Sequence, residues 1–317
     1  MPSGRWGRDV LSRIAESLFW IGRYLERAED TTRIVEVHLQ LLLDDPSVDQ
    51  DEAAVSLLAV MGAPVGASAD TNEVLRALCY DPLSSCSVAA ALGGAREAAR
   101  RARETVSIEM WEAINTTWNS VKGGRLQRMR PASAFRHVRE RCAVITGTAD
   151  QTMSHDEGWH FLTLGRSLER VDMTARLIST AQVTSGSQSA WNNVLRGCGA
   201  HHAFVRTYGG VTTDKDAAEF LLLDRLFPRS VVHNLGAAEA ALAELDFAGG
   251  RRVGFNDEAR RLLGTARAAL EYRPPGRMLE DLPLRMTDLQ RTCNQVSETV
   301  STRYFSGATA ATWSGGN

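Results

Sequence analysis

The residues best suited to chemistry in this chain lie in a charged twelve-residue segment that occurs twice. The first copy, GRYLERAEDTTR at residues 22–33, returns 143 positions later as GRSLERVDMTAR at residues 165–176, with seven of twelve positions identical. Most of the identical residues are charged, whereas an ordinary amphipathic helix repeats its apolar spacing and varies its charges. The repeat therefore predicts a fold with two related halves and a polar site to which both copies contribute.

The surroundings of these charges indicate that they are buried. On a helical wheel one arc of each copy is apolar, and the opposite arc carries the charges together with large apolar residues such as Phe19 and Met173. An unpaired ion in such a place costs several kcal/mol, so we expect the charges to be paired. We predict that Glu26 pairs with arginines of the second copy and Glu169 with those of the first. The candidate residues are Arg23, Glu26, Arg27, Arg33, Arg166, Glu169, Arg170 and Arg176.

A second interpretation of the same residues is a binding pocket. The two copies contain six arginines against five acids, which leaves a surplus of guanidinium charge. Guanidinium groups hold carboxylates and phosphates by two hydrogen bonds at once. The sequence favours the internal network and leaves the anion site open.

A third candidate lies in FLLLDRLFPRSV, residues 220–231, which places Asp224, Arg225 and Arg229 around a helix break. A new helix is expected near Arg229 with Pro228 at its first position, and free N–H groups at a helix start bind anions. An Asp–Arg pair beside a proline turn explains the same residues more simply. Another helix start is expected at residues 154–157, where Ser154 and Glu157 have the spacing of a capping box.

No catalytic or metal-binding pattern accompanies these charges. The sequence has no P-loop, GxSxG, HExxH, Cys–His pairing or dinucleotide-binding glycine motif. Its five cysteines are scattered and never form a CxxC pair, which is typical of reduced thiols in the cytoplasm. We therefore expect no catalytic residue, no metal and no cofactor.

The composition is that of a water-soluble globular protein. The chain has 317 residues, of which 44% are hydrophobic and 23% charged, with a formal net charge of -2. This charge gives no basic footprint for nucleic acid, and no segment has the length and apolarity of a membrane span. We expect neither nucleic acid nor membrane among its partners.

The apolar spacing predicts an all-α fold, a single multi-helix bundle with the two repeated Glu-Arg helices in it. Residues 10–305 are expected to form the domain, between a disordered extension at 1–9 and a disordered tail at 306–317. The short apolar run at 220–223 does not distinguish strand from helix. The expected helices are 11–43, 89–103, 107–121, 134–149, 158–182, 191–207, 231–245, 258–271 and 279–304.

Four ordered strings resemble the Alpha-E family, bacterial helical proteins of unknown function with Glu-Arg motifs. The strings are AESLFWIGRYLERAEDTTR (15–33), AREAARRARETVSIEMWEAIN (95–115), TMSHDEGWHFLTLGRSLERVDMTAR (152–176) and EFLLLDRLFPRSV (219–231). The family usually has Asn where Ala98 stands, so no polar role is assigned at that position. The resemblance implies association with circularly permuted ATP-grasp ligases and with transglutaminase-like peptidases, in systems that make and trim a peptide or amide product.

Two classes of function follow. The first, which we favour, is an accessory protein without its own catalytic activity, which docks on an ATP-grasp amide ligase and holds an anionic substrate or product. The second is an enzyme that uses the Arg/Glu network for acyl or phosphoryl transfer or hydrolysis. The lack of a nucleophile–base pair or metal set in the four strings favours the first.

Overall fold

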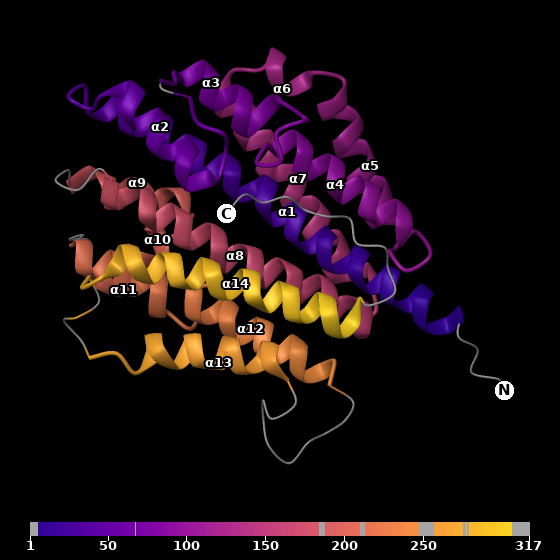
Figure 1. Ribbon diagram of the computed structural model, residues 1–317. Coiled ribbons are helices and arrows are strands. Elements are labelled where there is room, and N and C mark those ends of the chain that lie inside the picture. Colours follow the sequence, from indigo (N-terminus) through magenta and orange to yellow (C-terminus); the bar gives the residue numbers. More distant parts are fainter. Residues whose placement is uncertain are drawn as a thin grey trace.

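The computed structural model describes residues 6–66, 68–183, 188–209, 213–246, 257–274, 277 and 279–305, and every regular element in these ranges is helical (Figure 1). The chain therefore has the predicted all-α fold. The elements in order are α1 (Trp6–Asp44), α2 (Gln50–Met61), α3 (Thr71–Leu75), the π-helix η1 (Arg76–Tyr80), α4 (Val88–Arg101), α5 (Ile108–Lys122), α6 (Arg125–Arg128), α7 (Pro131–Thr152), α8 (Glu157–Val183), α9 (Gln188–Gly197), α10 (His201–Tyr208), α11 (Asp214–Leu223), α12 (Val231–Glu244), α13 (Glu258–Glu271) and α14 (Leu282–Tyr304).

The long helices α1 and α8 lie side by side at the centre, and each carries one copy of the charged segment (Figure 1). Helices α4 and α7 pack on α1, whereas α12 and α14 pack on α8. The central pair is thus covered on both sides, and its apolar stripes are buried, from Leu18 to Val35 in α1 and from Phe161 to Ile178 in α8. This enclosure is why charges on the pair have little access to water.

The sequence spacing between the two charged segments recurs in the helices that follow them. The two charged segments begin 143 residues apart. Helix α11 begins 143 residues after the start of α3, and α12 begins 143 residues after the start of α4. Ser87 and Ser230 are the N-caps of α4 and α12, and their hydroxyls donate to the carbonyl oxygens of Asp81 and Asp224. The correspondence ends there, because α13 begins later after α5 than this spacing requires.

Two predicted helix starts are wrong in detail. Helix α12 begins at Val231, the start of the expected span 231–245, but its N-cap is Ser230, so Pro228 and Arg229 lie in the preceding turn and Pro228 is not the first helical residue. Helix α8 begins at Glu157, but the carboxylate of Asp156 rather than the hydroxyl of Ser154 accepts from its first N–H groups. Asp156 directly precedes the first helical residue, and its side chain therefore reaches those donors first.

Other boundaries also differ from the sequence prediction. The expected helix 191–207 is broken into α9 and α10 at Gly199, whose φ of 65° ends a right-handed helix. The undecided run at 220–223 belongs to α11. Of the expected extension 1–9, residues 6–9 lie in α1 and the others lie outside the described residues, as does the expected tail 306–317. None of the described helices has a stretch long and apolar enough to span a bilayer.

Candidate functional site

Two glycines set the distance between α1 and α8. A Cβ atom at Gly22 would overlap the carbonyl oxygen of Leu162, and one at Gly165 would overlap the carbonyl oxygen of Phe19. The two contacts are reciprocal, because Phe19 and Leu162 occupy equivalent places three positions before the glycine of their own copy. Such close approach of the backbones brings the charged side chains one turn further along each helix within reach of the other helix.

Glu169 of α8 is the buried acceptor for two arginines of α1. Its Oε2 lies 2.6 Å from Nε of Arg23, and its Oε1 lies 2.5 Å from Nε of Arg27. Burial alone would raise the pKa of Glu169, but the charges of Arg27 and Arg23 outweigh it and lower the pKa to about 2. The carboxylate is therefore ionised at any physiological pH.

Glu26 of α1 has the reciprocal position towards α8. Arg170 donates to it through two nitrogens, Nε and Nη2, each 2.6 Å from a carboxylate oxygen. Burial opposes the ionised form, but Arg170 and Arg229 lower the pKa of Glu26 to about 2. Each copy of the segment thus supplies the glutamate that neutralises arginines of the other, as the sequence predicts.

Arg229, in the turn before α12, joins this network from outside the central pair. Its guanidinium lies 3.0 Å from Glu26 and 2.5 Å from Asp30, and it also contacts Glu29. Burial, reinforced by the charges of Glu26 and Glu29, raises the pKa of Asp30 to about 7 although Arg229 opposes this. The second carboxylate oxygen of Asp30, Oδ2, is buried without a hydrogen-bond partner among the described residues. Among Glu26, Asp30 and Glu169, Asp30 is therefore the acid that titrates near neutral pH.

Arg33 and Arg176 bind acids on their own helices and tie neighbouring elements to the pair. Arg33 lies 2.7 Å from Glu29 and donates to the carbonyl oxygen of Gly197 at 3.0 Å. Arg176 lies 2.8 Å from Asp172 and donates to the carbonyl oxygen of Val60 in α2. These two residues therefore fix α9 and α2 against the central helices.

Arg166 is held least tightly among the arginines of the two segments. Its nearest acid is Asp150 in α7, at 3.6 Å, and its guanidinium lies 5.8 Å from the centre of the Trp159 ring. Burial and the neighbouring charge of Arg170 lower the pKa of Arg166. Its side chain is 20% exposed, as is that of Arg176, but its ion pair is longer, so Arg166 is the more open of the two to another anion and forms an edge of the network.

Asp224 and Arg225 do not belong to the network. The carboxylate of Asp224 accepts hydrogen bonds from the backbone N–H groups of Leu226 and Phe227, both at 2.8 Å. Arg225 is 72% exposed and pairs with Glu271 at 2.9 Å. The turn thus contains the simpler arrangement of local contacts at Asp224 and Arg225, and only Arg229 reaches the charged segments.

Some partners of the network carry no signal in the sequence. Arg23 donates to the hydroxyl of Ser297 at 2.5 Å, across 274 residues, and Arg170 donates to the carbonyl oxygen of Pro228 at 3.2 Å. Neither a serine of α14 nor a backbone carbonyl can be recognised in the sequence as a partner, because only the fold places them beside a guanidinium. The pairing of the repeated segments could be predicted because both partners recur at one spacing.

Four of the five cysteines are buried, and Cys86 is half-buried. The described cysteines are free, and burial raises the pKa of both Cys79 and Cys198 to about 12, so their thiols stay protonated. No group of three or more His, Cys, Asp or Glu with metal-binding geometry occurs in the part of the chain that the structure describes. The arrangement fits charge neutralisation and the binding of an anion at its edge.

Comparison with known proteins places this arrangement in a family. A family model described as a predicted alpha-helical domain with a conserved ER motif, Alpha-E, matches residues 10–305. Uncharacterized proteins of Mycobacterium bovis and Mycobacterium tuberculosis are 26% identical over 272 residues, covering 77% of this chain and 31% of theirs. The chain thus spans about a third of the length of these curated relatives, and no solved structure matches it. It belongs to the Alpha-E family, and the dipeptides Glu26-Arg27 and Glu169-Arg170 at the centre of its network fit the description of that family.

Proposed function

We propose that this protein is an accessory partner of an ATP-grasp peptide or amide ligase, and that the edge of its Glu–Arg network at Arg166 holds an anionic group of the substrate or product. In this proposal the protein supplies a rigid helical scaffold and a binding contact, and the ligase supplies the chemistry. A transglutaminase-like peptidase is a second proposed partner.

The observation that carries the proposal is the pairing of both buried glutamates of the network with arginines. Glu26 and Glu169 each accept from two arginines, so their carboxylates are stabilised as anions and are poor proton donors or acceptors at neutral pH. Such a network suits the fixing of helix register better than acid–base catalysis.

Two further findings support a partner role. The resemblance to the Alpha-E family implies association with ATP-grasp ligases, and the chain belongs to that family. The matching region makes up only 31% of the mycobacterial relatives, so there it is joined to a longer sequence. A domain that occurs joined to other sequence is well placed to act together with it.

Charge supports an anion at the edge of the network. Seven arginines, namely those of the two segments and Arg229, face five acids (Glu26, Glu29, Asp30, Glu169 and Asp172), which leaves at least two positive charges in excess (7 − 5). Asp150 offsets one of them but is 48% exposed and 3.6 Å from Arg166. A carboxylate or phosphate could therefore compete with Asp150 for Arg166.

The test of partnership is co-purification of the intact protein with the ATP-grasp ligase of the same genome, with and without ATP and amino acids. We expect the tagged ligase to retain the protein and to form more product in its presence. Failure of the ligase to retain the protein under any of these conditions, with product formation unchanged, would overturn the proposal.

The test of the anion contact is titration calorimetry with phosphate, ATP, glutamate and short acidic peptides, for the protein alone and with its ligase. Arg166→Gln should weaken the binding of the effective anion about tenfold or more. Arg291→Gln, at an arginine that is 60% exposed and distant in the sequence, is the matched control and should not. Equal binding by wild type and Arg166→Gln would place the anion elsewhere, and turnover of a substrate by the protein alone would favour the enzymatic alternative.

A further inference from the structure

Basic side chains gather where the end of α5, the short helix α6 and the first turns of α7 meet, and Figure 1 shows α6 at the outer edge of the molecule. The sequence from 113 to 139 contains no aspartate or glutamate. Five of its six Lys and Arg side chains are exposed and form no ion pair with a described residue, whereas Arg139 pairs with Glu36. These five, the basic corner, are Lys122, Arg125, Arg128, Arg130 and Arg136.

The backbone holds the side chains of the basic corner together. Gly124, with a φ of 74°, lets the chain turn directly from α5 into α6, and the buried Leu126 anchors α6 in the core. Helix α6 packs against both α5 and α7. Burial and the charges of Arg125 and Arg141 lower the pKa of His137, so a guanidinium of α6 lies close to α7. The basic corner is therefore one surface rather than five separate charges.

Stabilisation of the fold does not explain this gathering of like charges. Most of the other described arginines pair with a carboxylate, as exposed Arg100 does with Glu97 at 2.9 Å. In α6, by contrast, Arg125 and Arg128 are three positions apart on one helix, where side chains of like charge repel each other. The arrangement fits a surface whose charge is neutralised by another molecule.

Charge and size indicate the chemistry of that molecule. Guanidinium groups bind carboxylates through two hydrogen bonds at once, and clusters of arginines recognise acidic motifs in proteins. Without the basic corner the chain has 31 basic residues (36 − 5) against 38 acids. A long polyanion such as a nucleic acid would extend from the corner onto this negatively charged remainder and be repelled, whereas a short acidic segment would not.

We propose that the basic corner docks a short segment, rich in Asp and Glu, of a partner protein. The corner is separate from the anion contact at Arg166. Asp150, the acid nearest to Arg166, lies 14 residues beyond Arg136 on α7, which is about 20 Å along a helix that rises 1.5 Å per residue. The docking surface thus goes beyond the anion contact, and it stands whether or not the partner is a ligase.

A decaglutamate peptide tests the recognition of acidic segments, by fluorescence anisotropy with the intact protein. We expect the labelled peptide to bind at about 50 mM salt and to bind roughly tenfold more weakly at about 300 mM salt, because salt screens exposed charges. Oligothymidylate of about thirty nucleotides, the nucleic-acid probe, should bind more weakly than the peptide. Absence of peptide binding at millimolar concentration in low salt, or tighter binding of the oligonucleotide, would overturn the proposal.

Two double variants locate the peptide. Arg125→Gln with Arg128→Gln should weaken its binding about tenfold or more and leave the melting temperature unchanged or higher, because repulsion within α6 is relieved. Arg196→Gln with Arg206→Gln is the matched control, since both arginines are exposed and lack an ion pair among the described residues, and it should change binding by less than about twofold. Equal weakening by the two pairs, or none by the first, would place the peptide outside the basic corner.

Discussion

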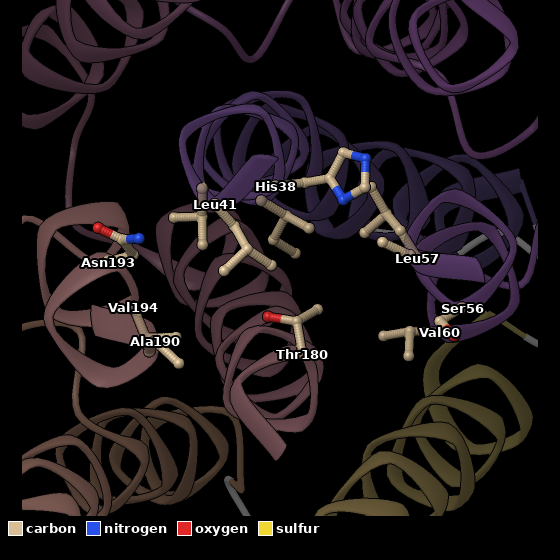
Figure 2. A pocket seen from close by; sticks show the side chains of 12 residues that line it. His38, Leu41, Ser56, Leu57, Val60, Thr180, Ala190, Asn193 and Val194 are labelled. Atoms are coloured by element: carbon tan, nitrogen blue, oxygen red, sulfur yellow. The ribbon is translucent and has the colours of Figure 1, made fainter. Parts of the chain in front are cut away.

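The pair of central helices is built in two different ways along its length. In the charged region, from Gly22 to Arg33 and from Gly165 to Arg176, the backbones nearly touch and the buried carboxylates bind guanidinium groups of the other helix. One or two turns further along, α1, α2, α8 and α9 line a small pocket with mostly apolar walls (Figure 2), and the Nε2 atom of His38 lacks a hydrogen-bond partner among the described residues. The regions meet at Val60, whose side chain lines the pocket while its carbonyl oxygen accepts from Arg176.

The difference shows what each kind of contact demands of a sequence. A buried ion must have a partner of opposite charge, so ions that pair across two helices appear as matched patterns in both segments. An apolar pocket needs only side chains that are too small or too far apart to fill it, and such residues do not differ from those of a filled core. Rigidity is therefore expected in the first region, and looser packing in the second.

The largest effect is expected where the helices touch. Gly22→Ala or Gly165→Ala would drive a methyl group into a backbone carbonyl, which cannot move aside as a side chain can, so α1 and α8 would separate. We expect each to destabilise the fold by more than about 4 kcal/mol or to prevent folding, as measured by urea unfolding.

Gly147→Ala in α7 is the matched control, since a Cβ atom there meets nothing within 4 Å. It should be neutral or stabilising by up to about 1 kcal/mol, because Ala favours a helix more than Gly does. A loss below about 1 kcal/mol for both Gly22→Ala and Gly165→Ala would show that the helices are not held this closely.

The next largest effect concerns a buried carboxylate. Glu169→Ala leaves Arg23 and Arg27 buried without their acceptor and should cost about 3 kcal/mol or more of unfolding free energy. Glu97→Ala is the comparison, because Glu97 forms ion pairs but is 43% exposed, and it should cost less than about 1 kcal/mol. Equal and small losses in both variants would mean that the charged region is solvated.

Much of this arrangement could be predicted from the sequence, because long helices with strong apolar spacing dominate it. The spans of α1, α4, α5, α8 and α13 agree with the prediction to within a few residues. Helix α2 was not predicted, since it is short and lies between polar turns, and the break at Gly199 was missed because glycine also occurs inside helices. These errors arise where tertiary contacts, rather than the local spacing of apolar residues, determine the backbone conformation.

The residues of the site likewise divide into those that the sequence predicted and those that it did not. The cross-pairing of Glu26 and Glu169 followed from the repeat, whereas the place of Arg229 did not, because nothing in its own segment shows that the turn before α12 lies against Glu26 and Asp30. His38 gave no signal at all, since a single histidine on a helix is more often a core residue than part of a site. The pocket could be recognised only once α2 and α9 were in place.

A smaller effect is expected at Asp30, whose contribution to stability changes with pH in the opposite sense to those of Glu26 and Glu169. Its folded pKa of about 7 lies above its usual value of 3.8, so the folded protein gains less from ionisation and its stability falls as pH rises between those values. Glu26 and Glu169 have folded pKa values of about 2 against 4.5, so their contribution is present above pH 4.5 and lost as pH falls towards 2.

Asp30→Asn keeps an acceptor for Arg229 and removes the ionisation. The free energy of unfolding of the variant, relative to that of wild type, should rise by about 1 kcal/mol or more from pH 5 to pH 8, as measured by urea unfolding at each pH. A difference from wild type that is the same at both pH values would show that Asp30 is ionised in both.

The smallest effect is expected in the pocket. His38→Phe removes an imidazole whose Nε2 is buried without a partner among the described residues and keeps a ring of similar shape. We expect the variant to be as stable as wild type or more stable by about 1 kcal/mol in thermal unfolding. A loss of more than about 2 kcal/mol would show that His38 makes a contact on which the fold depends, and the contrast with Glu169→Ala would disappear.

The claim that buried Glu–Arg pairs hold α1 against α8 is tested most directly by a double-mutant cycle on Glu26 and Arg170, which contact each other through two distances of 2.6 Å. Urea unfolding of wild type, Glu26→Gln, Arg170→Gln and the double variant gives the free energy of coupling between the two side chains. A coupling of about 2 kcal/mol or more is predicted, because either single substitution leaves a buried partner unsatisfied. A coupling within about 0.5 kcal/mol of zero would contradict the account, since the pair would then contribute no more than an exposed one.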